Sequence, residues 1–242
     1  MNWQKKPLIF LFCLPVFLTC GIEDYYYLPQ VPERGITRRF NTEATVNMPP
    51  LSEFYATGYV VFYKIYTSDN DNDNIDILRT FPRISIDYGA LLPYTDPSNA
   101  TSLPSITTFS SRGFYELELE GANIRNTVLS KSGGTFKILF PPSSGNHPSI
   151  EFDGDTYFLL RSNGAGAFNP RPADRWFFSS DDLKNFDNAT ATVNADVSGQ
   201  SGIPEFAYAS MYIAAVGQNP SNFTKLYGKP THISIFKLTP LN

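Results

Sequence analysis

The chain has 242 residues, of which 42% are hydrophobic and 15% aromatic, so it contains ample material for a buried core. Its 19 Lys and Arg stand against 23 Asp and Glu, which gives a formal net charge of −4. Because no long basic run accompanies this balance, we exclude nucleic acid as a partner.

The first element is a short segment typical of a signal peptide. Lys5 and Lys6 form a basic start, and residues 8–18 are apolar apart from Pro15. About eleven apolar residues fit a signal-peptide core and fall well short of the roughly 20 needed to span a bilayer. We therefore expect residues 1–19 to be a signal peptide and the mature chain to be exported.

Cys20 follows directly, in the sequence FLTCG. Residues 17–21 resemble the lipobox of bacterial lipoproteins, although Phe17 and Thr19 depart from its usual residues. The resemblance implies cleavage just before Cys20. It also implies a thioether-linked diacylglycerol on the new N-terminal cysteine, with an N-acyl chain such as palmitate.

Cysteine counting favours the same interpretation. The chain has two cysteines, Cys13 and Cys20, and Cys13 lies within the expected signal. The mature chain would then hold a single cysteine, which excludes an internal disulfide. Acylation explains this cysteine, since two or three acyl chains hold a protein on a membrane far more firmly than one. The alternative is a freely secreted protein in which Cys20 is an intermolecular thiol.

The next segment, residues 20–50, is expected to be the lipidated N-terminus and an extended tether, because Pro29 and Pro32 disfavour helix. Residues 36–46 are a candidate first strand within it. No later apolar stretch is long enough to cross a membrane as a helix. Residues 51–242 are expected to form one β-sandwich domain.

Strand patterns recur along this domain, and the many Phe and Tyr residues favour strands. Residues 56–66, ATGYVVFYKIY, are apolar on both faces, which is typical of a central strand buried on both sides. An aromatic platform for a ligand is the alternative. Residues 206–216 and 231–238 are two long strands separated by a turn, and they predict a hairpin. We expect further strands at 114–119, 135–140 and 156–161, and a capped helix start at 179–183.

The hairpin carries a resemblance to known folds. The sequence IPEFAYASMYIAAVGQNPSNFTKLYGKP resembles the F strand and following loop of fibronectin type III and immunoglobulin-like domains, with Tyr208 and Ala214 at matching positions. GYVVFYKIY would be the C strand. The resemblance implies an immunoglobulin-like antiparallel β-sandwich. The interval from residue 66 to residue 206 is too long for a plain domain of this type, so a large insertion or a second sheet is required.

A second resemblance is carried by three patches, CGIEDYYYLP, GYVVFYKIY and YGKPTHISIFKL. Together they are similar to uncharacterised lipoproteins of treponemal spirochaetes. This implies a surface or periplasmic lipoprotein, and the family brings no known activity to transfer.

An acidic loop is the one candidate metal site. Alternating carboxylates can converge on calcium, and this loop carries four of them, at Asp69, Asp71, Asp73 and Asp76. An EF-hand would require Gly and Glu where this chain has Asn74 and Thr80. The alternative is a solvated acidic turn.

Catalytic patterns are not supported, and we expect no enzyme. The SGNH spelling around His147 is a coincidence, because the residues of that hydrolase family lie in separate blocks. No G-x-S-x-G elbow is present, and the other histidine, His232, lies on a predicted strand. Two isolated histidines without a spare cysteine also argue against zinc.

The sequence therefore predicts a cell-envelope lipoprotein, anchored at the outer membrane or its periplasmic face, that binds an envelope or host protein or a glycan. An envelope hydrolase and a purely structural protein are the alternatives. A binding module predicts an exposed aromatic or acidic patch at one end of the sandwich. We expect the loops at 68–74 and 217–222 to carry recognition, since loops on a rigid scaffold do so commonly.

Overall fold

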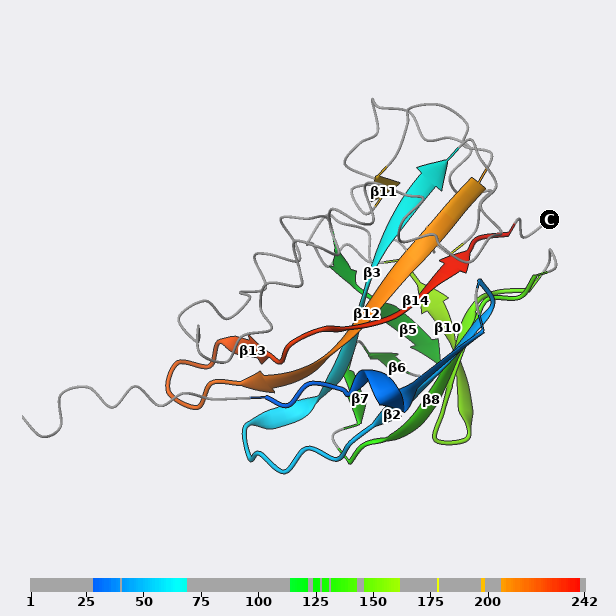
Figure 1. Cartoon of the computed structure of the whole chain (residues 1–242). Coiled ribbons are helices and arrows are strands. Elements are labelled where there is room, and N and C mark those ends of the chain that lie inside the picture. The colour runs from blue at the N-terminus through cyan, green and yellow to red at the C-terminus, as the bar shows by residue number, and fades with distance from the viewer. Residues whose placement is uncertain are drawn as a thin grey trace, which may run out of the picture.

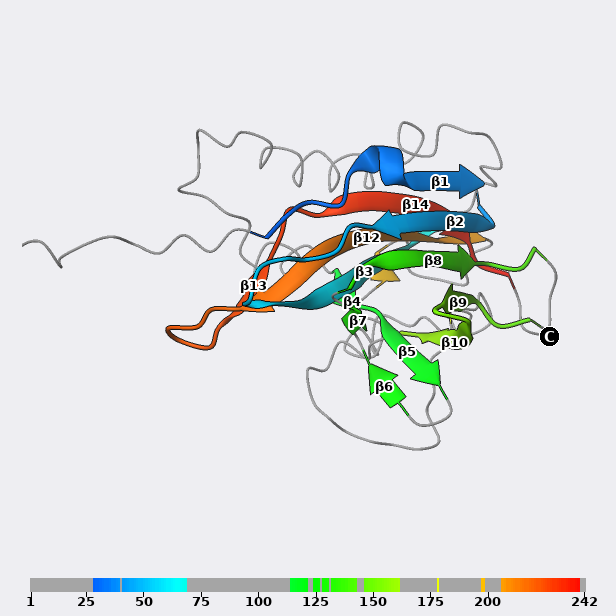
Figure 2. The same cartoon turned by 90° about the horizontal axis from the view of Figure 1, so that it is seen from below.

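Two β-sheets packed face to face make up the computed structural model of the chain (Figures 1 and 2). The structure describes residues 28–39, 41–68, 114–121, 124–126, 128–130, 132–142, 146–161, 178, 197–198 and 206–239. In these ranges the helical structure is the single turn η1 (Glu33–Gly35), and no helix is long and apolar enough to cross a membrane. The expected all-β sandwich is confirmed.

The first sheet has seven strands in the order β1-β2-β8-β9-β10-β5-β6, and each neighbouring pair is antiparallel. In that order the strands are β1 (Ile36–Arg39), β2 (Glu43–Met48), β8 (Gly134–Leu139), β9 (Ser149–Phe152), β10 (Asp155–Leu160), β5 (Glu118–Gly121) and β6 (Ile124–Asn126).

The second sheet is built on two long strands, β3 (Ala56–Ser68) and β12 (Phe206–Gln218), which pair antiparallel along their whole length. On the edge away from β3, β12 pairs antiparallel with β13 (Lys225–Tyr227) and β14 (Thr231–Lys237). The other edge of β3 pairs with three short strands: β4 (Tyr115–Glu116), β7 (Val128–Ser130) and the parallel β11 (Val197–Ser198).

β3 is central because both of its faces are apolar. Tyr59, Val61, Tyr63 and Ile65 enter the core between the sheets and are at most 3% exposed. On the opposite face of the same strand, Val60 and Phe62 belong to a second apolar cluster. The expectation of a strand buried on both sides is therefore confirmed.

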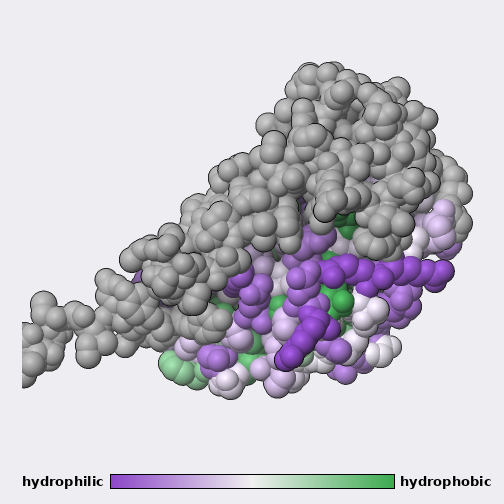
Figure 3. All heavy atoms as spheres, in the orientation of Figure 1, coloured by the Kyte–Doolittle hydropathy of each residue, from purple (hydrophilic) through white to green (hydrophobic). Residues whose placement is uncertain are grey.

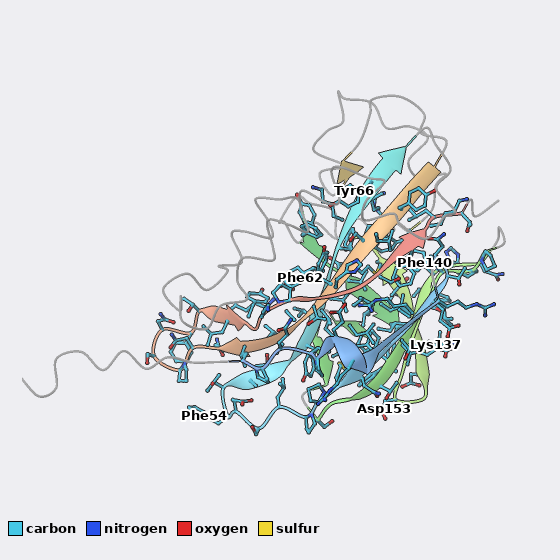
Figure 4. The ribbon with its side chains drawn as sticks, viewed as in Figure 1. Phe54, Phe62, Tyr66, Lys137, Phe140 and Asp153 are labelled. Carbon is cyan, nitrogen blue, oxygen red and sulfur yellow. The ribbon has the colours of Figure 1, made fainter. Side chains whose placement is uncertain are left out.

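Aromatic rings join the two sheets. Phe140, which follows β8, stacks on Phe236 of β14 with ring centres 4.5 Å apart. Phe178 touches Phe140 on one side and Tyr63 of β3 on the other, at 5.8 Å and 4.8 Å between ring centres. Figure 4 shows Phe140 in this position between the sheets. Each such buried ring stabilises the fold by about 1.5–3 kcal/mol.

The expected hairpin of residues 206–216 with 231–238 is confirmed, since β12 pairs with β14 from Tyr208 with Lys237 to Ile213 with Thr231. β13 extends the same edge beyond this register. The other expected strands also form: 114–119 becomes β4 and β5, 135–140 becomes β8, and 156–161 becomes β10.

The long interval between β3 and β12, expected as an insertion, supplies most of the first sheet. β5, β6, β8, β9 and β10 all come from it. The expected helix start at 179–183 lies outside the described residues.

The folded part begins earlier than the expected boundary at residue 51. Leu28 and Val31 are 3% and 0% exposed, and β1 and β2 are two strands of the first sheet, joined by a turn in which Asn41 has φ +66°. Thr231 Oγ1 donates to the Val31 carbonyl at 2.5 Å. From Leu28 on, the segment expected as a tether is therefore part of the sandwich, because the core buries its apolar residues.

Candidate functional site

The candidate sites named from the sequence fall mostly outside the described residues. This holds for Cys20 and for the acidic loop residues Asp69, Asp71, Asp73 and Asp76. Lipidation and calcium binding therefore stay predictions. Within the ranges that the structure describes, no three His, Cys, Asp or Glu side chains come together as a metal site.

The two histidines lie in different parts of the fold. His147 precedes β9 of the first sheet and packs edge-on against Phe158, with ring centres 5.6 Å apart. His232 lies on β14 of the second sheet, 4.9 Å from the ring of Tyr212. Burial, and then the charge of Arg38, lower the pKa of His232 to about 3, so its imidazole is neutral at physiological pH. The structure does not bring the two imidazoles together.

The outer face of the second sheet carries a row of aromatic and charged side chains. Lys64 Nζ lies 5.1 Å from the ring of Tyr66 and 5.6 Å from that of Phe114. Phe114 in turn packs edge-on against Tyr212 at 5.3 Å. These residues are buried, Lys64 being 8% exposed, so the row is part of the packed structure. Such low exposure favours a structural role for these rings over an aromatic platform that is open to a ligand.

A carboxylate, Glu116, bonds two side chains of β13 beside these residues. Glu116 of β4 accepts hydrogen bonds from Tyr227 Oη at 2.6 Å and from Lys225 Nζ at 2.5 Å. Burial, and then the bond to Glu116, raise the pKa of Tyr227 far above its ordinary value. The phenol therefore stays protonated as a donor. It links β13 to β4 across the two long strands.

One end of the sandwich exposes two large aromatic side chains. Phe54, just before β3, is 78% exposed, and Phe223, in the turn between β12 and β13, is 72% exposed. Figure 4 shows Phe54 projecting from this end, and a green, hydrophobic group of atoms lies at the same edge of the surface in Figure 3. We call this feature the aromatic end. It consists of residues 53–55 and 217–224.

The two loops of the aromatic end are bonded to each other. Gln218 N donates to the Tyr55 carbonyl at 2.9 Å, beside the ring of Phe54, which packs edge-on on Tyr55 at 5.3 Å. Glycine is required at the junction. A Cβ on Gly217 would lie 2.5 Å from the Tyr55 oxygen. Phe54 and Phe223 therefore sit on neighbouring loops.

The turn that carries Phe223 is held by its own polar groups. Phe223 N donates to the Asn219 carbonyl at 2.8 Å, and Gln218 Nε2 donates to the Phe223 carbonyl at 3.2 Å. Phe223 has φ +59°, a left-handed conformation that costs a residue with a Cβ about 1–2 kcal/mol. The turn thus holds an aromatic residue where glycine or asparagine would be less strained.

Two hydrogen bonds hold the loop that carries Phe54. Tyr59 Oη donates to the Pro49 carbonyl, and Ala56 N donates to the Glu53 carbonyl at 3.0 Å. Burial, and then the nearby Glu53, raise the pKa of Tyr59 to about 12, which keeps this phenol a donor. Both exposed rings are therefore presented on fixed loops, an arrangement that can make apolar contacts with another surface.

The sequence pointed to only part of this end. The loop at 217–222 was expected to carry recognition, but Phe223 lies one residue beyond it, and Phe54 was not singled out. The available signal was an aromatic residue among turn formers, in LSEFY and PSNF. The expected loop at 68–74 lies outside the described residues after Ser68.

Comparison of the chain with protein-family models, with curated proteins and with solved structures finds no match. The resemblances to immunoglobulin-like domains and to treponemal lipoproteins therefore stay predictions. Function has to be argued from the residues themselves.

Proposed function

We propose that this chain is a lipid-anchored protein of the bacterial cell envelope that acts by binding rather than by catalysis. The anchor is Cys20, in its lipobox-like context after a signal-peptide pattern. The mature chain would stay at a membrane through its acyl chains.

The observation that carries the binding role is the aromatic end. Phenylalanine is among the residues most often buried, yet Phe54 and Phe223 are 78% and 72% exposed on adjoining loops. Contiguous exposed apolar surface commonly marks an interaction site. An exposed aromatic patch at one end of the sandwich is expected of a binding module rather than of a structural protein.

The first experiment tests the anchor, by mass spectrometry of the mature protein from its native host beside a Cys20→Ala variant. We expect an N-terminal Cys20 carrying diacylglycerol, and loss of detergent-phase partitioning in the variant. An unmodified N-terminus cut elsewhere would overturn the lipoprotein proposal. It would leave a freely secreted protein with Cys20 as an intermolecular thiol.

The second experiment tests the binding role, with a Phe54→Ser, Phe223→Ser double variant and a Phe158→Ser control. Phe158 is the other exposed large hydrophobic among the described residues, at 45%, and it lies on β10 of the other sheet. We expect the double variant to lose chemical cross-linking to envelope components while keeping its thermal unfolding. Unchanged cross-linking would count against the aromatic end as the contact surface.

A further inference from the structure

We infer that the aromatic end rests on the bilayer that holds the lipid anchor, with Phe54 and Phe223 inserted among the lipid headgroups. This inference rests on the proposed function, because it requires an acylated Cys20. It names the partner of the exposed rings as a membrane surface rather than a protein or a glycan.

The described part of the chain begins close to the aromatic end. Leu28 lies against Gly228, where a Cβ would be 3.0 Å from the carbonyl oxygens of both Leu28 and Pro29. Gly228 N donates to the Ala215 carbonyl at 2.8 Å. Ala215 is three positions before Gln218, and Gln218 bonds the loop that carries Phe54. At the rise of a β-strand, three residues span about 10 Å, so Leu28 lies about 10 Å from the aromatic end as measured along β12. Figure 1 shows the blue start of the described chain beside this part of β12.

The reach of residues 20–27 limits how far Leu28 can lie from an anchor on Cys20. Cys20 precedes Leu28 by eight residues, which span at most about 29 Å when fully extended. The opposite end of β12, at Phe206, is nine residues from Ala215, or about 30 Å along the strand. With an anchor on Cys20, the aromatic end can therefore reach the membrane with little extension of residues 20–27, whereas the end where β3 finishes and β12 begins can approach it only when those residues are almost fully extended.

The aromatic end carries little charge. Residues 217–224, GQNPSNFT, contain no charged side chain, and Glu53 is the one charge at positions 53–55. Moving such a tip into the headgroup region displaces few strongly hydrated groups. Phe is typical of the apolar face of segments that lie in a membrane interface. Lys225, which follows the turn and is 45% exposed, bonds Glu116 through its Nζ at 2.5 Å, so its charge keeps a carboxylate partner when the tip meets the headgroups.

The test places a fluorescent dye at the aromatic end of the lipidated protein. With Cys13 removed with the signal and Cys20 acylated, a new cysteine is the one free thiol of the chain. Phe54→Cys, Phe223→Cys and the control Arg39→Cys would each be labelled with an environment-sensitive maleimide and reconstituted into phosphatidylcholine vesicles that contain a doxyl-labelled lipid. Arg39 is an exposed residue at the end of β1, beside the turn where Asn41 pairs with Phe236, and so lies at the opposite end of the sandwich.

We expect dyes at positions 54 and 223 to brighten on the vesicles and to be quenched by the doxyl lipid several-fold more than the dye at position 39. Equal quenching at all three positions would overturn the inference and leave the anchor intact. Dyes at 54 and 223 that change only on native envelope fractions, and not on lipid vesicles, would also overturn it, in favour of a protein or glycan partner. Two dyes per chain would show an unacylated Cys20 and overturn the proposed anchor together with this inference.

Discussion

Gly133 and Gly154 both have a left-handed backbone, but only one of them is crowded. Gly133 has φ +77°, and a Cβ there would lie 2.6 Å from the Met48 oxygen and 2.8 Å from Pro50 N. Gly154 has φ +86°, with nothing within 4 Å of the same position. The difference separates the conformational cost of a side chain from the cost of a clash with neighbouring backbone.

Gly154→Ala should therefore lower the free energy of unfolding by about 1–2 kcal/mol, the cost of the left-handed conformation alone. Gly133→Ala should cost about 3 kcal/mol or more, because the loop that ends β2 must also move. Urea unfolding of the two variants checks this. Equal losses would contradict the crowding at Gly133.

His232 predicts how stability depends on pH. Its pKa is lowered from 6.5 to about 3 in the folded chain, first by burial and then by Arg38. As the pH falls below 6.5, the unfolded chain binds a proton at this residue that the folded chain does not. Stability should therefore fall with pH in this window, by up to about 1.4 kcal/mol per pH unit.

The measurement is the urea midpoint of the natural chain and of His232→Gln between pH 7.5 and 5. We expect the variant to lose part of the slope, because its unfolded chain no longer takes up a proton at position 232. Identical slopes would show that His232 takes up its proton equally in the folded and unfolded chains.

At the scale of the element, β12 is paired on both edges and buried from Ala207 to Gly217, so small changes within that stretch should alter the stability of the fold. Ser210 is 0% exposed, and none of the described residues hydrogen-bonds its Oγ. Ala214 lies on the same face of the same strand and is also fully buried. A hydroxyl can therefore be removed at Ser210 and added at Ala214 on the same buried face of β12.

Ser210→Ala should be neutral or stabilise the protein by up to about 1 kcal/mol, because it removes a buried hydroxyl that none of the described residues hydrogen-bonds. Ala214→Ser should destabilise by about 1–3 kcal/mol, because it buries a new hydroxyl in an apolar cluster. Thermal unfolding of both variants checks this. A clear loss of stability in Ser210→Ala would mean that the hydroxyl is bonded in the folded chain.

For the whole molecule, the position of the N-terminal boundary decides what folds. Removing residues before 51 deletes β1 and β2 and exposes the edge of β8. It also removes core side chains that are at most 7% exposed, namely Leu28, Val31, Ile36, Ala44, Val46 and Met48. Each larger one contributes about 1.5–3 kcal/mol, against a total stability of about 5–15 kcal/mol for a typical domain.

A chain that starts at residue 51 should therefore not fold, whereas a chain that starts at residue 20 with Cys20→Ser should unfold cooperatively. Near-ultraviolet circular dichroism and urea unfolding distinguish the two. The same midpoint for both chains would show that residues 28–50 are a tether after all.

The all-β class and the strands β3, β12 and β14 could be predicted from the residues alone, because alternation and two-faced apolar runs are local properties of the chain. The sequence is also the whole basis for the signal peptide, for Cys20 and for the acidic loop from Asp69 to Asp76. Those expectations depend on residue order rather than on packing, and they lie outside the described residues.

Which segments share a sheet, and where the domain starts, became apparent from the folded structure. The interval between β3 and β12 could be assigned to the first sheet only once its short strands were paired with β2, since register between distant strands leaves little trace in composition. The aromatic end depends on the same kind of information. Phe54 and Phe223 are far apart in the chain, and the loops that carry them adjoin because the antiparallel pairing of β3 with β12 places Tyr55 beside Gln218.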